Sequence, residues 1–132
     1  MSLSDLNPAP VLRVAIGGLG TIGLAIARAL DQGIPGLELR AIAARDIAKA
    51  QERLADFASM PRIVPLSQLS TLADVVVECA PASVYDEVAR PTVEAGRTLV
   101  TMSSGALLSR NDLIKRAKQR SEEHTSELQS PI

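Results

Sequence analysis

The chain has 132 residues, 46% of them hydrophobic, and a formal net charge of −1. This length and composition allow one domain with an aliphatic core, and the near-neutral charge gives no electrostatic reason to expect binding to nucleic acid or to an anionic membrane. The single cysteine excludes an internal disulfide, residues 1–10 lack the basic and apolar regions of a secretory signal, and no apolar run is long enough to span a bilayer. We therefore expect a soluble cytoplasmic protein with a flexible N-terminus at residues 1–10.

Short apolar runs alternate with longer amphipathic segments from residue 11 to residue 119. The predicted elements, in chain order, are a strand at 11–16, a helix at 21–30, a strand at 37–43, a helix at 47–57 capped by Asp46, strands at 63–64 and 75–77, a helix at 83–95 that ends at Gly96, a strand at 98–102 and a helix at 111–118. The first helix is predicted to share one apolar face among Ile22, Ile26, Ala29 and Leu30.

Strands that alternate with helices are typical of an α/β fold with a parallel sheet and right-handed crossovers. The rhythm here predicts one domain at residues 11–119, a Rossmann-type doubly wound parallel sheet with the strand order 3-2-1-4-5. Ligands of such sheets bind at the carboxyl ends of the strands, near the neighbouring strands 1 and 4. Residues that directly follow strands are therefore the candidates for function.

The first strand runs directly into Gly18-Leu19-Gly20-Thr21-Ile22-Gly23, a G-x-G-x-x-G sequence that also opens the first helix. In this context the motif is typical of a loop that holds a dinucleotide pyrophosphate. Gly18 would allow the tight turn, Gly20 the close approach of the phosphates and Gly23 the packing of helix on strand. The helix N-terminus would offer free N–H groups to the phosphates. The alternative, a glycine-rich turn without a ligand, is disfavoured by this context.

The residues after the second predicted strand bear on the choice between NAD and NADP. An acidic residue about 20 positions beyond the motif would bind the ribose of NAD, but the chain has Ala44 there, 21 residues after Gly23. Arg45 follows and could pair with the 2′-phosphate of NADP and stack on adenine, which favours NADP. Arg45 could instead be a solvated surface residue. Asp46 could reach the ribose, although helix capping is its favoured role.

Small residues follow two further strands at the same predicted edge. Cys79, Ala80 and Pro81 come after the fourth strand, and Ser103, Ser104, Gly105 and Ala106 come after the fifth. These segments leave room for a nicotinamide ribose and complete the predicted cofactor-binding set. Cys79 is expected to be an inert buried thiol rather than a nucleophile, since no histidine is at hand to activate it. Glu78 is expected to be a structural acid.

Residues 120–132 have no apolar period and differ in character from the rest of the chain. Residues 120–130 match, residue for residue, the translation of a common sequencing-library adapter. We therefore expect the natural sequence to depart from this chain near Gln119, with 120–132 a non-native tail. The tail holds His124, the only histidine, so we predict no catalytic residue and no metal site in residues 11–119.

Three segments, RVAIGGLGTIG, DVVVECAP and EAGRTLVTMSSGAL, resemble the N-terminal half of L-aspartate dehydrogenases, a family similar to the NAD-binding domain of homoserine dehydrogenase. The resemblance covers roughly residues 12–118. It implies NAD(P)-dependent oxidation of L-aspartate to iminoaspartate, which yields oxaloacetate and ammonia and can feed NAD biosynthesis. It further implies that Gly18–Gly23 contact the pyrophosphate, Arg45 the adenosine ribose, and Cys79–Pro81 with Ser103–Ala106 the nicotinamide and substrate side.

The family's second domain, with its catalytic histidine and substrate-binding residues, has no counterpart in residues 1–119. The resemblance therefore implies a cofactor-binding half that is inactive alone and takes an amino-acid substrate only with that domain. A homoserine dehydrogenase-like or imine reductase cofactor domain is the alternative within the same class. A stand-alone dinucleotide-sensing module is the alternative from another functional class. A homo-oligomer that associates through exposed apolar surface is a further alternative that the sequence leaves open.

Overall fold

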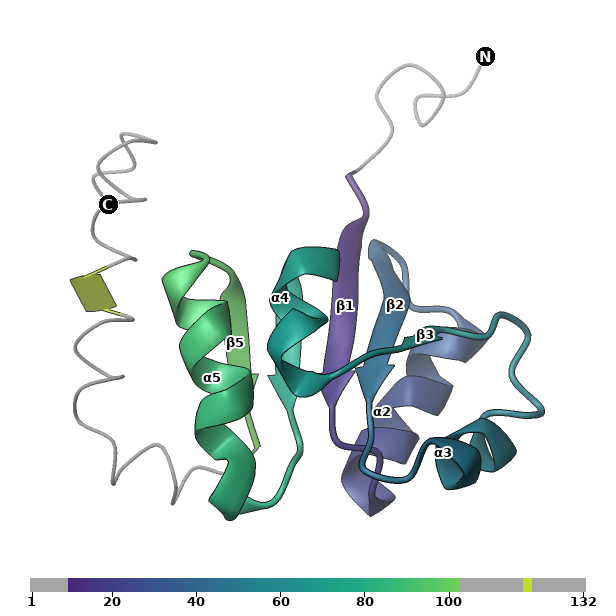
Figure 1. Ribbon diagram of the computed structural model, residues 1–132. Helices are drawn as coiled ribbons and strands as arrows, with labels where there is room; N and C mark the ends of the chain where they lie inside the picture. The colour runs from purple at the N-terminus through teal and green to yellow at the C-terminus, as the bar shows by residue number, and fades with distance from the viewer. Residues whose placement is uncertain (1–9, 103–117, 120–132) are drawn as a thin grey trace, which may run out of the picture.

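The computed structural model describes residues 10–102 and 118–119. Within them, five parallel strands form one sheet in the order β3-β2-β1-β4-β5 (Figure 1). The strands are β1 (Leu12–Gly17), β2 (Leu37–Ala43), β3 (Arg62–Ile63), β4 (Val75–Glu78) and β5 (Thr98–Thr101). This order confirms the predicted Rossmann-type doubly wound sheet.

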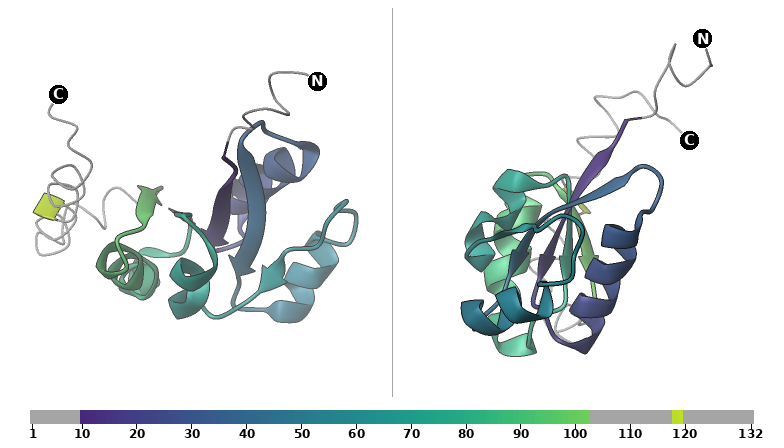
Figure 2. Two further views of the ribbon diagram at one scale, coloured as in Figure 1. Left: turned by 90° about the horizontal axis from the view of Figure 1, so that it is seen from above. Right: turned by 90° about the vertical axis from the view of Figure 1, so that its right-hand side faces the viewer.

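Helices cover both faces of the sheet. They are α2 (Thr21–Gln32), α3 (Ile47–Arg53), α4 (Leu69–Leu72) and α5 (Tyr85–Glu94), with the 3-10 turns η1 (Leu66–Gln68) and η2 (Ala82–Val84). Figure 1 shows α4 and α5 in front of the sheet and α2 behind it, and the side view in Figure 2 separates the same two layers. The sheet is therefore the middle layer of three.

Alternation along β1 supplies both halves of the core. Ile16 packs with Ala27 of α2 and Leu54 just beyond α3 in one cluster, whereas Ala15 packs with Val88 of α5 in the other. Successive strand residues point to opposite faces, so a central strand buried on both sides must be apolar at every position. The uninterrupted apolar run of β1 from residue 14 to residue 16 meets this requirement.

Several predicted elements differ from those observed. The buried face of α2 consists of Gly23, Ala27 and Leu30, and Ile22 is 54% exposed. The prediction that Ile22 and Ala29 share the buried face with Leu30 was wrong. Gly23 lies on that face instead, because α2 packs there against the backbone of the glycine loop. The second helix ends at Arg53 rather than at residue 57, α4 was not predicted, and the predicted helix at 111–118 lies outside the described residues except for its last position.

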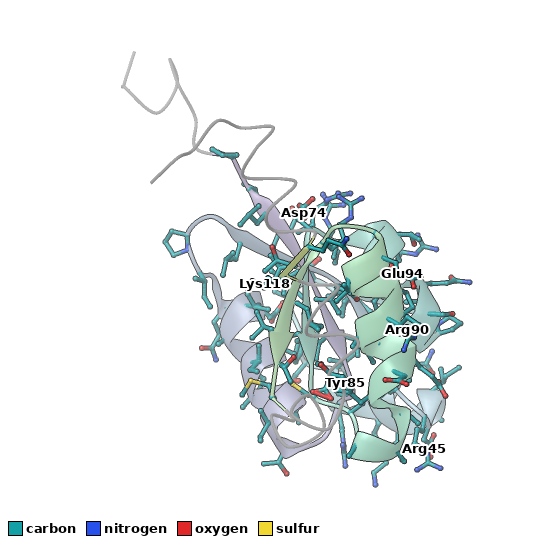
Figure 3. All side chains as sticks on the ribbon, turned by 90° about the vertical axis from the view of Figure 1, so that its left-hand side faces the viewer. Arg45, Asp74, Tyr85, Arg90, Glu94 and Lys118 are labelled. Carbon is teal, nitrogen blue, oxygen red and sulfur yellow. The ribbon has the colours of Figure 1, made fainter. Side chains whose placement is uncertain are left out.

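An ion-pair cluster holds three strands together at the amino end of the sheet. Arg13 donates from Nη2 to Oδ1 of Asp74 at 2.9 Å, and its backbone N–H donates to Oδ2 at 2.9 Å. Arg97, just before β5, lies 3.9 Å from the same carboxylate. These hydrogen bonds from Arg13 hold the pKa of Asp74 well below its usual range. Figure 3 shows Asp74 and Arg45 at opposite ends of the molecule, so this cluster is remote from the carboxyl edge.

Candidate functional site

The carboxyl ends of β1, β2 and β4 meet at one edge of the sheet. Gly17 pairs with Ala43 in β2 and with Glu78 in β4. The amide of Gly18 donates to the carbonyl of Ala43, and that of Cys79 donates to the carbonyl of Gly17, each at 2.8 Å. The three segments that leave these strands therefore start from a fixed common edge.

A cleft of about 460 Å³ opens at this edge. Eight of its lining residues belong to the predicted cofactor-binding set: Gly18, Leu19, Gly20, Ala44, Arg45, Cys79, Ala80 and Pro81. The other lining residues are Asp46, Lys49, Ala50 and Arg53. Thr21 lines a neighbouring hollow on the outer side of the glycine loop, together with Gly20, Leu24, Ala25, Arg28 and Arg53. The topology thus brings together segments more than 50 residues apart in the chain.

Not every residue of the predicted set is exposed at the cleft. Ile22 and Gly23 do not line this cleft or the hollow. Leu19 borders the cleft, but the residue as a whole is buried in the core. Ser103, Ser104, Gly105 and Ala106 lie outside the described residues.

Two glycines of the motif are required by the protein's own packing. Gly18 has φ +106°, and a Cβ there would lie 2.8 Å from the carbonyl carbon and oxygen of Cys79. A Cβ on Gly23 would collide with the carbonyl oxygen of Gly18. These two positions let the glycine loop pass over β4 and let α2 pack against it.

Gly17, to which the sequence reasoning gave no role, is also restricted. A Cβ there would lie 3.1 Å from Val88 and 3.2 Å from Leu69. The glycine therefore lets α4 and α5 approach the end of β1. The signal was present in the sequence as a fourth glycine, but its partners are 52 and 71 residues further along the chain.

Gly20 differs from the other glycines of the loop. It is exposed, it precedes α2 as the N-cap with φ −84°, and a Cβ there would meet no protein atom within 4 Å. Neither backbone conformation nor internal packing requires glycine at this position. The space a Cβ would occupy borders the cleft, and the first N–H groups of α2 have no acceptor within the helix. This geometry fits a phosphate group that approaches the backbone closely at Gly20.

The segment after β2 supplies the cations of the cleft. Asp46 caps α3 as predicted, because its Oδ1 accepts from the backbone N–H of Lys49 at 3.0 Å. Ala44 packs partly against the core, and Arg45 is exposed at the cleft. Sequence reasoning missed Lys49 and Arg53, which also line the cleft. Their i, i+4 spacing was a usable signal, since it places them on one face of a helix beside the buried Ala50.

The residues at the end of β4 are poorly suited to covalent chemistry. Burial, with a smaller contribution from the carboxylate of Glu78, raises the pKa of the Cys79 thiol to about 11. The thiol therefore remains protonated near neutral pH, which agrees with the interpretation of Cys79 as inert. Glu78 is fully buried, and the hydroxyl of buried Tyr85 lies 3.4 Å from that of Thr101. Within residues 10–102 and 118–119, no group of three or more histidine, cysteine or acidic residues could hold a metal ion.

The same part of the chain contains no helix long and apolar enough to cross a membrane. The longest of the described helices, α2, has 12 residues.

Comparisons with known proteins converge on one family. Residues 18–127 match the family described as "Homoserine dehydrogenase, NAD binding domain". The chain is 46% identical over 116 residues to an L-aspartate dehydrogenase of Bradyrhizobium diazoefficiens, in an alignment that covers 88% of this chain and 41% of the relative. It is 43% identical over 111 residues to L-aspartate dehydrogenase 3 of Bordetella bronchiseptica, covering 80% of this chain and 39% of the relative.

The fold has a solved counterpart in a homoserine dehydrogenase from Thiobacillus denitrificans. The TM-score is 0.69 at 20% identity, and the match covers 85% of this chain and 28% of that one. The likeness supports the fold. The chain spans about two fifths of the length of the curated relatives it matches.

Proposed function

The chain belongs to the family of homoserine dehydrogenase NAD-binding domains, and from this premise we propose that it is the cofactor-binding part of an NAD(P)-dependent L-aspartate dehydrogenase. The family supports dinucleotide binding, and two relatives at 46% and 43% identity support aspartate as the substrate of the whole enzyme. The observation that carries the proposal is Gly20, a glycine that the fold does not need and that a bound phosphate would explain.

The residues of the cleft divide the work of holding the cofactor. The backbone from Gly18 to Gly20 and the N-terminus of α2 would hold the pyrophosphate. Cys79, Ala80 and Pro81 would line the nicotinamide side, where their small size leaves room for the ribose, and Ser103–Ala106 would continue that side. When bound, the cofactor supplies the hydride acceptor. The part of this chain is to bind and orient it.

We infer a preference for NADP over NAD. Ala44 offers no carboxylate to the ribose hydroxyls, whereas Arg45 and Lys49 both border the cleft on the β2 side. A 2′-phosphate carries negative charge that two cations would favour, and a guanidinium can bind a phosphate through two parallel hydrogen bonds. Asp46 is engaged as the cap of α3, which leaves it less suited to the ribose hydroxyls of NAD.

Oxidation of aspartate also needs a group that accepts the amine proton and a site that orients the substrate. Both would come from the three fifths of the relatives' length that this chain does not span. Cys79 is a poor candidate for the base, because its thiol has a pKa of about 11. The chain alone would therefore bind NADP(H) without turning over aspartate.

The experiment has two steps. First, the 132-residue chain is titrated with NADPH and NADH by nucleotide fluorescence, and we expect saturable binding that is tighter for NADPH. Second, the complete gene product is assayed for aspartate-dependent NADP⁺ reduction, with homoserine as the competing substrate. Absence of saturable binding overturns the cofactor assignment. Turnover of homoserine alone would favour the homoserine dehydrogenase alternative, and binding without any turnover would favour a dinucleotide sensor.

A further inference from the structure

Arg53, the last residue of α3, contacts the glycine loop directly. Its Nη1 donates to the carbonyl oxygen of Leu19 at 2.6 Å, across 34 residues of sequence. Leu19 is the residue between the first two glycines of the motif, and its side chain packs with Leu54 in the core. The loop is thus held at this residue by both its main chain and its side chain.

The contact has an electrostatic consequence for the site. A carbonyl oxygen carries partial negative charge, and the oxygen of Leu19 belongs to the loop that would cradle a doubly charged pyrophosphate. Left bare, this oxygen would repel the ligand. A guanidinium that accepts no hydrogen bonds and cannot lose its proton covers the oxygen and reverses the local charge.

The guanidinium of Arg53 has further donors to offer. It has five N–H groups, of which one is used on Leu19. No carboxylate in residues 10–102 lies within 4.0 Å of its nitrogens, whereas Arg28, which lines the same hollow, is paired with Asp56 at 3.0 Å. Arg53 borders the cleft on one side of Gly20 and the neighbouring hollow on the other. Its position follows from helix geometry, because side chains lean toward the N-terminus of their own helix.

We propose that Arg53 is a positioning residue for the dinucleotide: it fixes the Leu19 carbonyl within the phosphate loop and presents its remaining donors to the pyrophosphate. The inference rests on the proposed function and adds a residue to it. The role of Arg53 differs from the role proposed for Arg45 and Lys49. Those residues bear on the 2′-phosphate, which only NADP has, whereas Arg53 contacts the loop that NAD and NADP would share.

The test is calorimetric titration of the 132-residue chain and its variants with NADPH, NADH, ADP and 2′-AMP. ADP carries the pyrophosphate without the 2′-phosphate, whereas 2′-AMP carries the 2′-phosphate without the pyrophosphate. We expect R53Q to lower the affinities for NADPH, NADH and ADP by the same factor, about 10- to 100-fold for the loss of a charge-assisted contact. We expect 2′-AMP to bind R53Q as it binds the unmodified chain.

Two further variants sharpen the test. R28Q removes a cation of the same hollow that is already paired, and it should leave all four affinities within about twofold. R53K keeps the charge but not the planar fork, so it should recover part of the loss toward ADP. A thermal melt of each variant reports whether the fold is kept. If R53Q fails to fold, R53K replaces it in the test. The affinity of R53K for ADP must still be lowered, and its affinity for 2′-AMP must be unchanged.

The outcomes separate the two proposals. If the unmodified chain binds none of the dinucleotides, the proposed function fails. If it binds them and a folded R53Q or R53K binds ADP equally well, the function stands and the role of Arg53 is overturned. An equal loss for ADP and 2′-AMP would also overturn it, because a general loosening of the cleft would explain that result.

Discussion

Gly18 and Cys79 approach each other so closely that a Cβ on Gly18 would lie 2.8 Å from the Cys79 carbonyl, whereas a Cβ on Gly20, two residues later, would touch nothing. The two glycines therefore serve different ends. The first allows the loop to cross the end of β4, and the second leaves space at the cleft. A matched pair of substitutions can separate the two roles.

Gly20→Ala should leave the fold intact and weaken the binding of the dinucleotide. The new methyl group lies in open space and the φ of −84° suits alanine, so we expect a loss in stability of about 1 kcal/mol or less, as for alanine at an N-cap. The methyl group would hold the pyrophosphate off the backbone, and we expect NADPH affinity to fall at least roughly tenfold, or about 1.4 kcal/mol. Thermal melts and NADPH titration measure the two effects.

Gly18→Ala is the matched control. Its φ of +106° and its contact with Cys79 strain any side chain, at a cost of about 1–3 kcal/mol from the backbone conformation alone. The melting temperature should fall by roughly 5 °C or more for a domain of this size. A Gly20→Ala chain that binds NADPH normally would show that the space at Gly20 is not used by phosphate.

Arg45→Gln should change which cofactor is preferred. The residue is exposed at the cleft, and loss of its charge removes a partner for the 2′-phosphate but not for the rest of the molecule. We expect NADPH affinity to fall about 10- to 100-fold, as for a charge-assisted hydrogen bond, with NADH affinity changed less than about twofold. Fluorescence titration with both nucleotides gives the ratio. An equal loss for both would rule out a 2′-phosphate contact.

Local signals account for most of what the sequence predicted correctly. β2 was predicted at its observed bounds of 37–43, because a short run rich in apolar residues between a glycine and a polar segment needs no tertiary information. Asp46 was predicted as a cap for the same reason, since its partner Lys49 is three residues away. The strand order followed from the alternation of strands and helices.

The missed features depend on contacts between distant segments. The i, i+4 spacing of Lys49 and Arg53 indicates that they share one helix face. It does not show that this face docks beside the glycine loop, where Arg53 donates to Leu19. The buried face of α2 was misjudged because Ala27 and Gly23 look like weak core residues beside Ile22. The contact that selects glycine at position 23 is with the carbonyl oxygen of Gly18, and the helical pattern alone does not reveal it. α4 was not predicted because its four residues are too few to show a helical period.

Asp74→Asn should lower stability and change its dependence on pH. Hydrogen bonds from Arg13 lower the pKa of Asp74 in the folded protein, whereas an unfolded aspartate titrates near pH ~3.9. A lowered folded pKa gives stability that is present above the unfolded value and is lost as the pH falls below it. The melting temperature of the unmodified chain should therefore fall as the pH is lowered below about 4. In the Asp74→Asn chain the melting temperature should be lower at neutral pH and should drop less in acid.

Asp56→Asn provides the comparison for this titration. Its pKa is also lowered, mainly by a hydrogen bond from Arg28, but its side chain is 68% exposed against 30% for Asp74. Solvent screens an exposed pair, so the acid-dependent drop should be nearly unchanged in Asp56→Asn. An equal effect of the two substitutions would place the acid sensitivity outside the Arg13–Asp74 cluster.

Cys79 should be nearly unreactive toward thiol reagents in the folded chain. Burial raises its pKa to about 11, and only the thiolate attacks an alkylating agent. At pH ~8 a thiol of ordinary pKa is about one quarter ionised, and a thiol of pKa near 11 is about one thousandth ionised. Iodoacetamide should therefore modify Cys79 roughly 250-fold more slowly in the folded chain than in urea. Mass spectrometry of timed samples gives both rates, and the folded rate should rise with pH toward 11. Bound NADPH should slow it further, because Cys79 lines the cleft that the cofactor would fill. A rate in the folded chain that matches the rate in urea would mean that the thiol is neither desolvated nor shielded at the end of β4.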